Sequence, residues 1–238
     1  MGDLRIGDLE FQLNRKAIKH LHISVLPPDG KVRVSAPDRM TENAIRMALI
    51  ARIPWIRSQQ RSFADQPRQS ERSMESGESH YLWGRHYRLD VREQRGQHNV
   101  KITGSGKLQL TVSPGTTQEN RRRALNKFYR DEMGARLTAL SEYWQPVVGV
   151  QVSFLGIKKM KTKWGSCNTT KSRVWLNLEL AKKPPECLEY ILVHELVHLL
   201  ERHHNETFKA HLDRLMPDWR ERRDLLNQSP LAFEGWSY

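Results

Sequence analysis

Two absences narrow the classes of protein to which this 238-residue chain can belong. It has only two cysteines, Cys167 and Cys187, which are too few for the disulfide framework that stabilises small secreted domains. Long apolar runs are also missing, because the longest span only a few residues, such as 191–193, whereas a membrane-spanning helix needs about 20. Residues 1–10 contain no apolar core behind a basic start, so we expect no secretory signal, no membrane partner and a location in the reducing cytoplasm.

The charge is unbalanced, with 39 basic and 27 acidic residues and a formal net charge of +12. Such an excess attracts polyanions, nucleic acid above all, although an ordinary basic surface explains it equally well. The sequence contains no RNA-binding signature, no zinc-finger spacing and no basic leucine zipper. Any proximity to nucleic acid would therefore rest on backbone charge rather than on reading bases.

The first half of the chain is typical of β-structure. Residues 18–36 predict a hairpin around the turn signal Pro27-Pro28-Asp29-Gly30, and a helical period follows over 41–61. Strands are expected again at 81–91, 99–102 and 108–112. No internal repeat is evident.

The second half is mostly helical. We expect a long helix over 118–143, three short strands up to residue 178, a helix from Pro185 and a last helical stretch over 206–226 that is interrupted near Pro217. The sequence thus predicts an α+β protein, with a β-rich domain over 1–115 and a mostly helical domain with a small sheet over 116–238.

The segment His194-Glu195-Leu196-Val197-His198 carries the clearest chemical signal. Residues four apart on a helix face the same way, so His194 and His198 are able to present ring nitrogens to one metal ion. Glu195 lies one step round the helix, where it is placed to take a proton from water beside that ion. Because an apolar helix would not bury these polar groups without a partner, the pattern predicts a Zn²⁺ site.

A catalytic zinc ion usually has three protein ligands and one open position. His204 follows His198 by six residues, the compact spacing of the metzincins, but an unbroken helix would turn it away. The chain must therefore leave the helix near 201–203; metzincins use Gly there, whereas this chain has Glu201, and Asn205 is a good N-cap for a new helix. The residues that offer a third ligand are His203, His204, His211, Asp213, Asp218 and Glu221.

The segment HELVHLLERHHNETF, at 194–208, resembles the signature of the YgjP-like metallopeptidases, with Phe208 at the family's Phe position. Lys163-Trp164-Gly165-Ser166-Cys167 and Leu176-Asn177 resemble two further elements of that family, and the similarity covers about residues 10–228. The resemblance implies a zincin-like catalytic domain related to the SprT-like and WLM proteases. It also implies that His194, His198 and His204 are zinc ligands and that Glu195 is the catalytic acid/base.

Three other residues are expected near the substrate. Zincins bind extended substrate by backbone pairing along a strand beside the active-site helix, and the strands of Trp164 and Trp175 are the candidates for that edge. Asn177 is a candidate donor to a substrate carbonyl. His203 is a third substrate-binding hypothesis, and His203, Lys161 and Lys163 are hypotheses for the oxyanion partner. Packing of Trp164 and a satisfied turn at Asn177 are equally compatible with the sequence.

The function predicted from these features is zinc-dependent hydrolysis of peptide bonds, with a protein or peptide as substrate. Two alternatives stay open from the sequence. One is a nucleic-acid-binding protein in which zinc only stabilises the fold, and the other is a metal-dependent hydrolase of non-peptide substrates.

Overall fold

The computed structural model describes residues 2–26, 30–65, 73–104, 106–160 and 163–228. The chain divides into two compact units, of which the first contains residues 1–69 and the second residues 70–229. The mixture of sheets and helices confirms the α+β class. Within the described residues, no helix is both long and apolar enough to cross a membrane.

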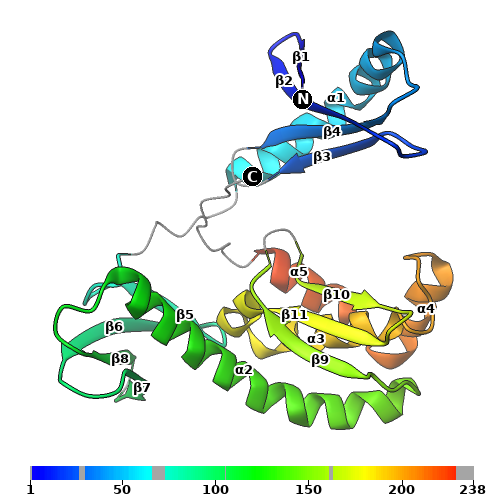
Figure 1. Ribbon diagram of the computed structural model, residues 1–238. Helices are drawn as coiled ribbons and strands as arrows, with labels where there is room; N and C mark the ends of the chain where they lie inside the picture. Colours follow the sequence, from blue (N-terminus) through cyan, green and yellow to red (C-terminus); the bar gives the residue numbers. More distant parts are fainter. Residues whose placement is uncertain (1, 27–29, 66–72, 105, 161–162, 229–238) are drawn as a thin grey trace. The chain divides into compact units, whose positions relative to one another are not determined.

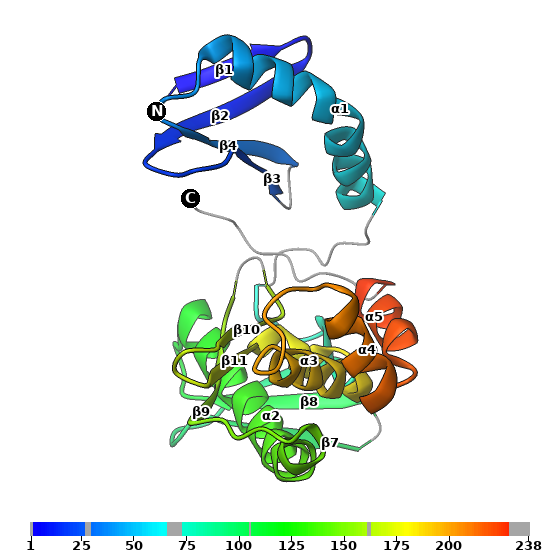
Figure 2. The ribbon, with the colours of Figure 1, turned by 90° about the vertical axis from the view of Figure 1, so that its right-hand side faces the viewer.

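The first unit is a four-stranded sheet covered on one face by a helix (Figures 1 and 2). Its elements are β1 (Gly2–Ile6), β2 (Leu9–Lys16), β3 (His22–Leu26), β4 (Lys31–Pro37) and α1 (Glu42–Asp65). The strand order is β1-β2-β4-β3, with β2 and β4 parallel. Inward-facing residues of the strands alternate with polar ones, and they pack on Ile45, Leu49 and Ile56 of α1 to form a separate core. The hairpin expected at 18–36 is therefore confirmed as β3–β4, but its turn at 27–29 lies outside the described residues.

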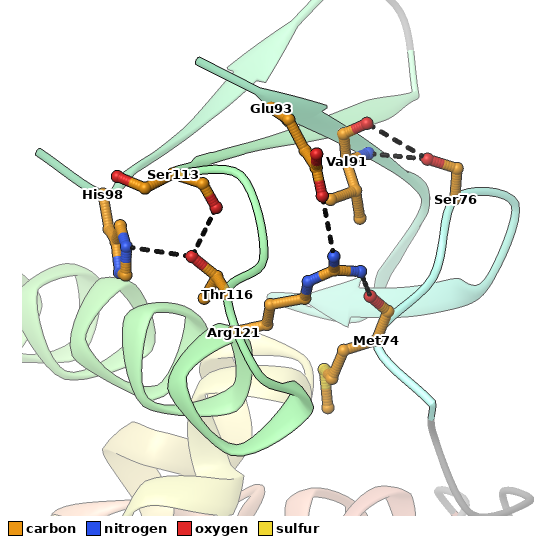
Figure 3. A network of polar contacts seen from close by, with 8 residues as sticks. All are labelled: Met74, Ser76, Val91, Glu93, His98, Ser113, Thr116 and Arg121. Atoms are coloured by element: carbon orange, nitrogen blue, oxygen red, sulfur yellow. Dashed lines mark hydrogen bonds and ion pairs between the residues drawn. The ribbon is translucent and has the colours of Figure 1, made fainter. Parts of the chain in front are cut away.

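The second unit begins with another four-stranded sheet followed by a long helix. Its strands are β5 (Ser79–Leu82), β6 (Arg85–Glu93), β7 (Asn99–Thr103) and β8 (Lys107–Val112), in the order β5-β6-β8-β7, and α2 (Gln118–Val148) follows them. Arg121 of α2 donates hydrogen bonds to the Met74 carbonyl and to Glu93, and Ser76 accepts one from the Val91 amide (Figure 3). The two Arg121 bonds tie the start of α2 to the end of β6 and to the segment before β5.

The remaining elements complete this unit. They are β9 (Phe154–Lys158), β10 (Gly165–Asn168), β11 (Arg173–Asn177), a 3-10 helix η1 (Leu178–Lys182), α3 (Pro185–Val197), α4 (Glu206–Leu215) and α5 (Trp219–Gln228). The sheet order is β10-β11-β9, so β10 is an edge strand. The long helix α2 runs from the β5–β8 sheet to this small sheet (Figure 1).

The division of the chain differs from the one expected at residue 115. Leu89, Leu108 and Leu110 of the second sheet share one hydrophobic core with Leu125 of α2 and Leu192 of α3. Strands β5–β8 therefore belong with helices α2 and α3, and the boundary of the β-rich first unit falls near residue 70. The expected boundary differs from the observed one because strand-like sequence occurs on both sides of residue 70, which hides the change of unit.

The two sheets with their helices repeat one topology, although the sequence shows no evident repeat. Each consists of two hairpins joined by a parallel pair of strands, β2 with β4 and β6 with β8, and then a helix. Two of the corresponding elements lie 76 residues apart: β4 and β8 begin at Lys31 and Lys107, and α1 and α2 are capped by the hydroxyls of Thr41 and Thr117. The first half of the second unit thus has the same topology as the first unit.

Candidate metal centre and active site

Helix α3 carries the first two histidines and Glu195. Pro185 occupies its first position, where the missing N–H costs no hydrogen bond, and nine of its thirteen residues are buried. His194 and Glu195 lie in the last turn, and His198 is the C-cap. The Nδ1 atom of His198 lies 3.3 Å from the Glu201 carbonyl oxygen. A proton on Nδ1 would donate to that carbonyl, which leaves the Nε2 lone pair free for a metal ion.

The chain leaves the helix at His198, three residues earlier than the sequence suggests. Turn hydrogen bonds from the amides of Leu200 and Glu201 to the Val197 carbonyl close the helix end. Asn205 then caps α4 by accepting a hydrogen bond from the Phe208 amide at 3.0 Å, as predicted. Glu201 has no positive φ, a conformation that only three described non-glycine residues adopt, so this turn does not require the glycine found in metzincins.

Because the helix ends at His198, the following turn brings His204 close to His194 and His198. One ring nitrogen from each of His194, His198 and His204 lies within 4.8 Å of the others, and the Nε2 atoms of His194 and His204 are 3.0 Å apart. Phe208 of α4 lies against all three rings, with centroid distances of 4.7–4.9 Å. Within the described residues this is the single group of three or more His, Cys, Asp or Glu residues that could hold a metal ion.

The other residues considered as third ligands lie elsewhere. The Asp213 carboxylate accepts hydrogen bonds from Trp219 and Arg220, and Asp218 pairs with Arg222. His203 is exposed, and its backbone amide donates to Glu201. Neither His211 nor Glu221 belongs to the cluster. Of the residues considered, only His204 completes a three-nitrogen set.

The donor set fits a divalent metal ion with an open position. Burial, together with His198 and His204, lowers the pKa of His194 to about 3, so its ring is neutral at physiological pH and able to ligate. Burial also lowers the pKa of His198. Among the described residues the group contains no fourth His, Cys, Asp or Glu, so an ion held by the three rings would keep a position for water or substrate.

Glu195 lies beside this group and against strand β10. Its side chain is buried, and burial raises its pKa to about 7, opposed by the charge of Lys163. A Cβ atom added to Gly165 would lie 2.5 Å from Glu195 Oε1, so only glycine allows the carboxyl group this close to the strand. A carboxyl group with a pKa near neutrality is suited to accept and return a proton at pH 7.

A cavity of about 790 Å³ lies in front of these groups. It is bounded on one side by α3 and on the other by β10 and the segments flanking that strand. Its lining includes Lys163, Trp164, Ser166, Cys167, Thr169, Thr170, Ile191 and Arg202, together with His194, Glu195, His198 and His204. The cavity is of the size that ligand sites commonly have.

Only some of the residues expected to contact substrate line the cavity. Trp164 and Lys163 line the cavity, whereas His203 does not, and Lys161 lies outside the described residues. Asn177 is buried at 5% exposure, and its amide group is used within the protein. It donates to the carbonyls of Met160 at 2.9 Å and Lys163 at 2.8 Å, and its oxygen accepts from the Met160 and Glu179 amides.

The contacts of Asn177 therefore support a structural role, in which its side chain forms hydrogen bonds within a buried turn. The residue holds the two ends of the segment that leads to Lys163 and Trp164. Sequence reasoning missed Gly165 and Arg202 as parts of the site. The close approach at Gly165 has a signal in the sequence, because a glycine at the first position of a strand allows another group to come close, but its partner Glu195 is 30 positions away.

Comparison with protein families gives a match over most of the chain. The family described as "YgjP-like, metallopeptidase domain" matches residues 19–229. The chain belongs to the YgjP-like metallopeptidase family. Membership implies a metallopeptidase that uses a divalent metal ion and acts on proteins or peptides, in agreement with the histidine group found in this YgjP-like chain.

Two solved structures are similar to part of this YgjP-like protein. They are the metallopeptidase zymogens abylysin of Pyrococcus abyssi and jannalysin of Methanocaldococcus jannaschii, each 22% identical with a TM-score of 0.35. The similarity covers 38% and 39% of this chain and 90% and 94% of theirs. Among curated proteins there is no significant match.

Proposed function

We propose that this protein is a zinc-dependent metallopeptidase in which His194, His198 and His204 hold the zinc ion and Glu195 moves the proton. The observation that carries the proposal is the convergence of three ring nitrogens within 4.8 Å beside a buried carboxyl group. Three neutral imidazoles and an open position are typical of catalytic zinc. When bound, zinc supplies Lewis-acid chemistry, which makes water a stronger acid and polarises a carbonyl group.

Glu195 performs the proton transfers in this proposal. Its carboxylate accepts a proton from the attacking water, and the resulting carboxylic acid then donates that proton to the amine that leaves. In the metal-free protein burial raises the pKa of Glu195 to about 7. The charge of a bound zinc ion would favour the carboxylate, which is the form that accepts the first proton. The charged Lys163 side chain, which lines the same cavity, is the proposed partner for the developing negative charge on the substrate oxygen.

We also propose that the substrate binds as an extended strand beside β10. This strand pairs with β11 on one side, and among the described strands none pairs with its outer edge. Backbone pairing at such an edge accepts many sequences, as a peptidase requires. Trp164 is a proposed substrate contact because it lines the cavity. Asn177 does not line it and instead donates a hydrogen bond to the Lys163 carbonyl.

The two cysteines support a reducing location, for which we propose the cytoplasm. Both are free, and Cys187 is buried. Burial and the nearby Glu195 raise the pKa of Cys167 to about 11, so its thiol is protonated and poorly reactive at neutral pH.

The test compares two glutamates of the same helix. Glu195→Gln and Glu186→Gln are purified alongside the unaltered chain, metal content is measured, and cleavage of a mixture of unfolded proteins is followed by mass spectrometry. Glu186 lies exposed in the first turn of α3, away from the cavity. The proposal predicts equal zinc content in all three proteins, with cleavage at least about 1,000-fold slower only for Glu195→Gln.

Other outcomes would separate the alternatives. Zinc without cleavage in any of the three proteins would remove the peptidase proposal and favour hydrolysis of another substrate. Undiminished cleavage by Glu195→Gln would remove the proposed role of Glu195. A protein that binds no zinc would contradict the metal centre itself.

A further inference from the structure

The surface of helix α1 carries an apolar stripe that its own fold does not use. The buried face of α1 is formed by Ile45, Leu49 and Ile56, which pack on the sheet of the first unit. On the opposite side, Met47 is 67% exposed, Ile50 47% and Trp55 42%. Ala51 and Pro54 between them are also exposed. Their spacing places all five on one face of the helix, which we call the α1 stripe.

The structural repeat shows that the α1 stripe is not required by this topology. The positions 76 residues later on α2 are Arg123, Asn126, Lys127, Arg130 and Asp131. In that copy the side chains of Arg123 and Lys127 are 74% and 76% exposed, and the face is polar. The same fold therefore forms with a polar surface here, and the apolar side chains of α1 need another explanation.

The charge around the α1 stripe selects the kind of partner. Between residues 43 and 64 the helix has four arginines and no acidic residue. By helical geometry Arg46 and Arg57 border one side of the stripe, Arg52 borders the other, and Arg61 follows at its end. Arg46 pairs with Glu42 and Arg57 with Asp8, so Arg52 and Arg61 carry the charge that the stripe offers to a partner. A rim of arginines around Met and Trp is typical of a protein-binding surface that takes an acidic partner.

Charge also argues against a partner within this chain or a second copy of it. Residues 1–69 contain 12 basic and 7 acidic residues, and the remainder of the chain contains 27 basic and 20 acidic. Each part is therefore net positive, so neither complements the arginines. Two stripes facing each other would bring eight arginines together in one interface, which is unfavourable.

The side chains of the stripe favour a protein helix over nucleic acid. Single-stranded nucleic acid is held by several aromatic side chains on which bases stack, and the stripe offers only Trp55. Aliphatic groups such as Ile50 and Pro54 gain little from phosphates. Their i, i+3, i+4, i+7 spacing instead forms a ridge of the kind that packs into the groove of another helix.

We propose that the α1 stripe is the docking site for an amphipathic helix of a different protein, with apolar residues along one face and Asp or Glu on both flanks. The stripe spans eight residue steps, about 12 Å, so the partner contributes at least two to three helical turns. The proposal does not depend on the metal centre, since all its residues lie in the first unit.

The experiment uses the full chain and a displayed library of 18-residue helical peptides. The library fixes apolar residues at i, i+3, i+4, i+7 and varies the flanking positions among Glu, Lys, Gln and Ser. The test variant transfers the residues of α2 to α1, as Met47→Arg, Ile50→Asn and Trp55→Asp together, which leaves the net charge unchanged. The matched control, Arg123→Ala with Lys127→Ala, alters the corresponding face of the other helix.

The proposal predicts that selected peptides are enriched in Glu at the flanks. The triple variant should bind them at least about ten-fold more weakly, with unchanged circular dichroism and melting temperature, while the control binds as the unaltered chain does. Arg52→Gln with Arg61→Gln should weaken binding less and reduce its salt dependence.

Three results would overturn the proposal. The first is selection of peptides without acidic enrichment, and the second is equal binding to the triple variant. The third is that the triple substitution instead abolishes self-association in sedimentation, or binding to phosphatidylserine vesicles or to a 20-nucleotide single-stranded DNA. That result would assign the stripe to a second copy, a membrane surface or nucleic acid.

Discussion

Gly165 of strand β10 and Glu195 of helix α3 lie closer together than any residue with a Cβ atom would allow. The added atom would meet Oε1 at 2.5 Å and Cγ at 2.7 Å. The contact fixes the distance between the edge of the small sheet and the carboxyl group. It therefore ties the proposed substrate strand to the proposed proton acceptor.

Gly165→Ala should displace the Glu195 carboxyl group without removing the metal ligands. A displacement of about 1 Å can cost on the order of 100-fold in rate, so we expect kcat/KM to fall by about that factor while zinc content stays the same. Gly134→Ala is the matched control, since a Cβ there meets nothing within 4 Å. Unchanged kcat/KM in Gly165→Ala would show that the contact does not position Glu195.

Phe208 is buried at 2% exposure beneath the three histidines. Phe208→Ala should lower the free energy of unfolding of the metal-free protein by about 3–5 kcal/mol, because it leaves a cavity in the core. It should also weaken zinc binding, since the rings of His194, His198 and His204 lose the surface against which they rest. Chelator competition and urea unfolding measure the two effects, and Phe208→Leu should preserve most of both.

A loss of stability in Phe208→Ala without weaker zinc binding would contradict the predicted effect on the metal ligands. If Phe208→Ala bound zinc as tightly as the unaltered protein, the histidines would be held by their own elements alone.

Substitution of Asn177 distinguishes a structural role of this residue from a role in substrate binding. Asn177→Ala should lower the free energy of unfolding by about 2–3 kcal/mol, because it leaves the carbonyls of Met160 and Lys163 without their donor. Asn168→Ala, at the exposed end of strand β10, should cost about 1 kcal/mol or less. If instead Asn177→Ala raised KM with no loss of stability, the residue would contact substrate directly.

The pH dependence of stability should report on Lys183, which is 4% exposed. Burial lowers its pKa to about 8, against the attraction of Glu179. The unfolded chain keeps this proton up to about pH 10.5, so between pH 8 and 10.5 the unfolded state binds more protons and stability rises with pH. Below pH 8 the buried Lys183 amine is charged, so burying its charge lowers the free energy of unfolding by the full amount.

Lys183→Met should therefore be more stable than the unaltered chain at pH 7, by on the order of 2 kcal/mol, with the difference shrinking as pH approaches 10.5. Urea unfolding at a series of pH values checks this. Parallel stability curves for the two proteins from pH 7 to 10 would show that the amine does not titrate as a buried group.

Local patterns were enough to predict the parts of the site that lie on one helix. His194 and His198 follow from helical spacing, and the break before Asn205 follows from its capping preference. The selection of His204 over His203 or Asp213 depends on where the turn after His198 directs the chain, which no single residue in 199–203 encodes. The contact of Gly165 with Glu195 is likewise a product of the packing of β10 on α3.

The repeat and the domain boundary were missed for a related reason. The two copies share few identities, such as Gly30 with Gly106 and Lys31 with Lys107, although the alternating burial of β4 and β8 is the same. Periodicity identifies the strands of each sheet but not which core they join. Leu108 and Leu110 enter the catalytic core because α2 packs on their sheet, and that packing is a long-range property.

X-ray absorption at the zinc edge of the purified, zinc-loaded chain counts the ligands of the metal directly. We predict three imidazole nitrogens and one light atom from solvent, all at about 2.0–2.1 Å, with one imidazole fewer in His204→Ala. A sulfur ligand at about 2.3 Å, which would implicate Cys167, or an unchanged imidazole count in His204→Ala, would contradict the three-histidine centre.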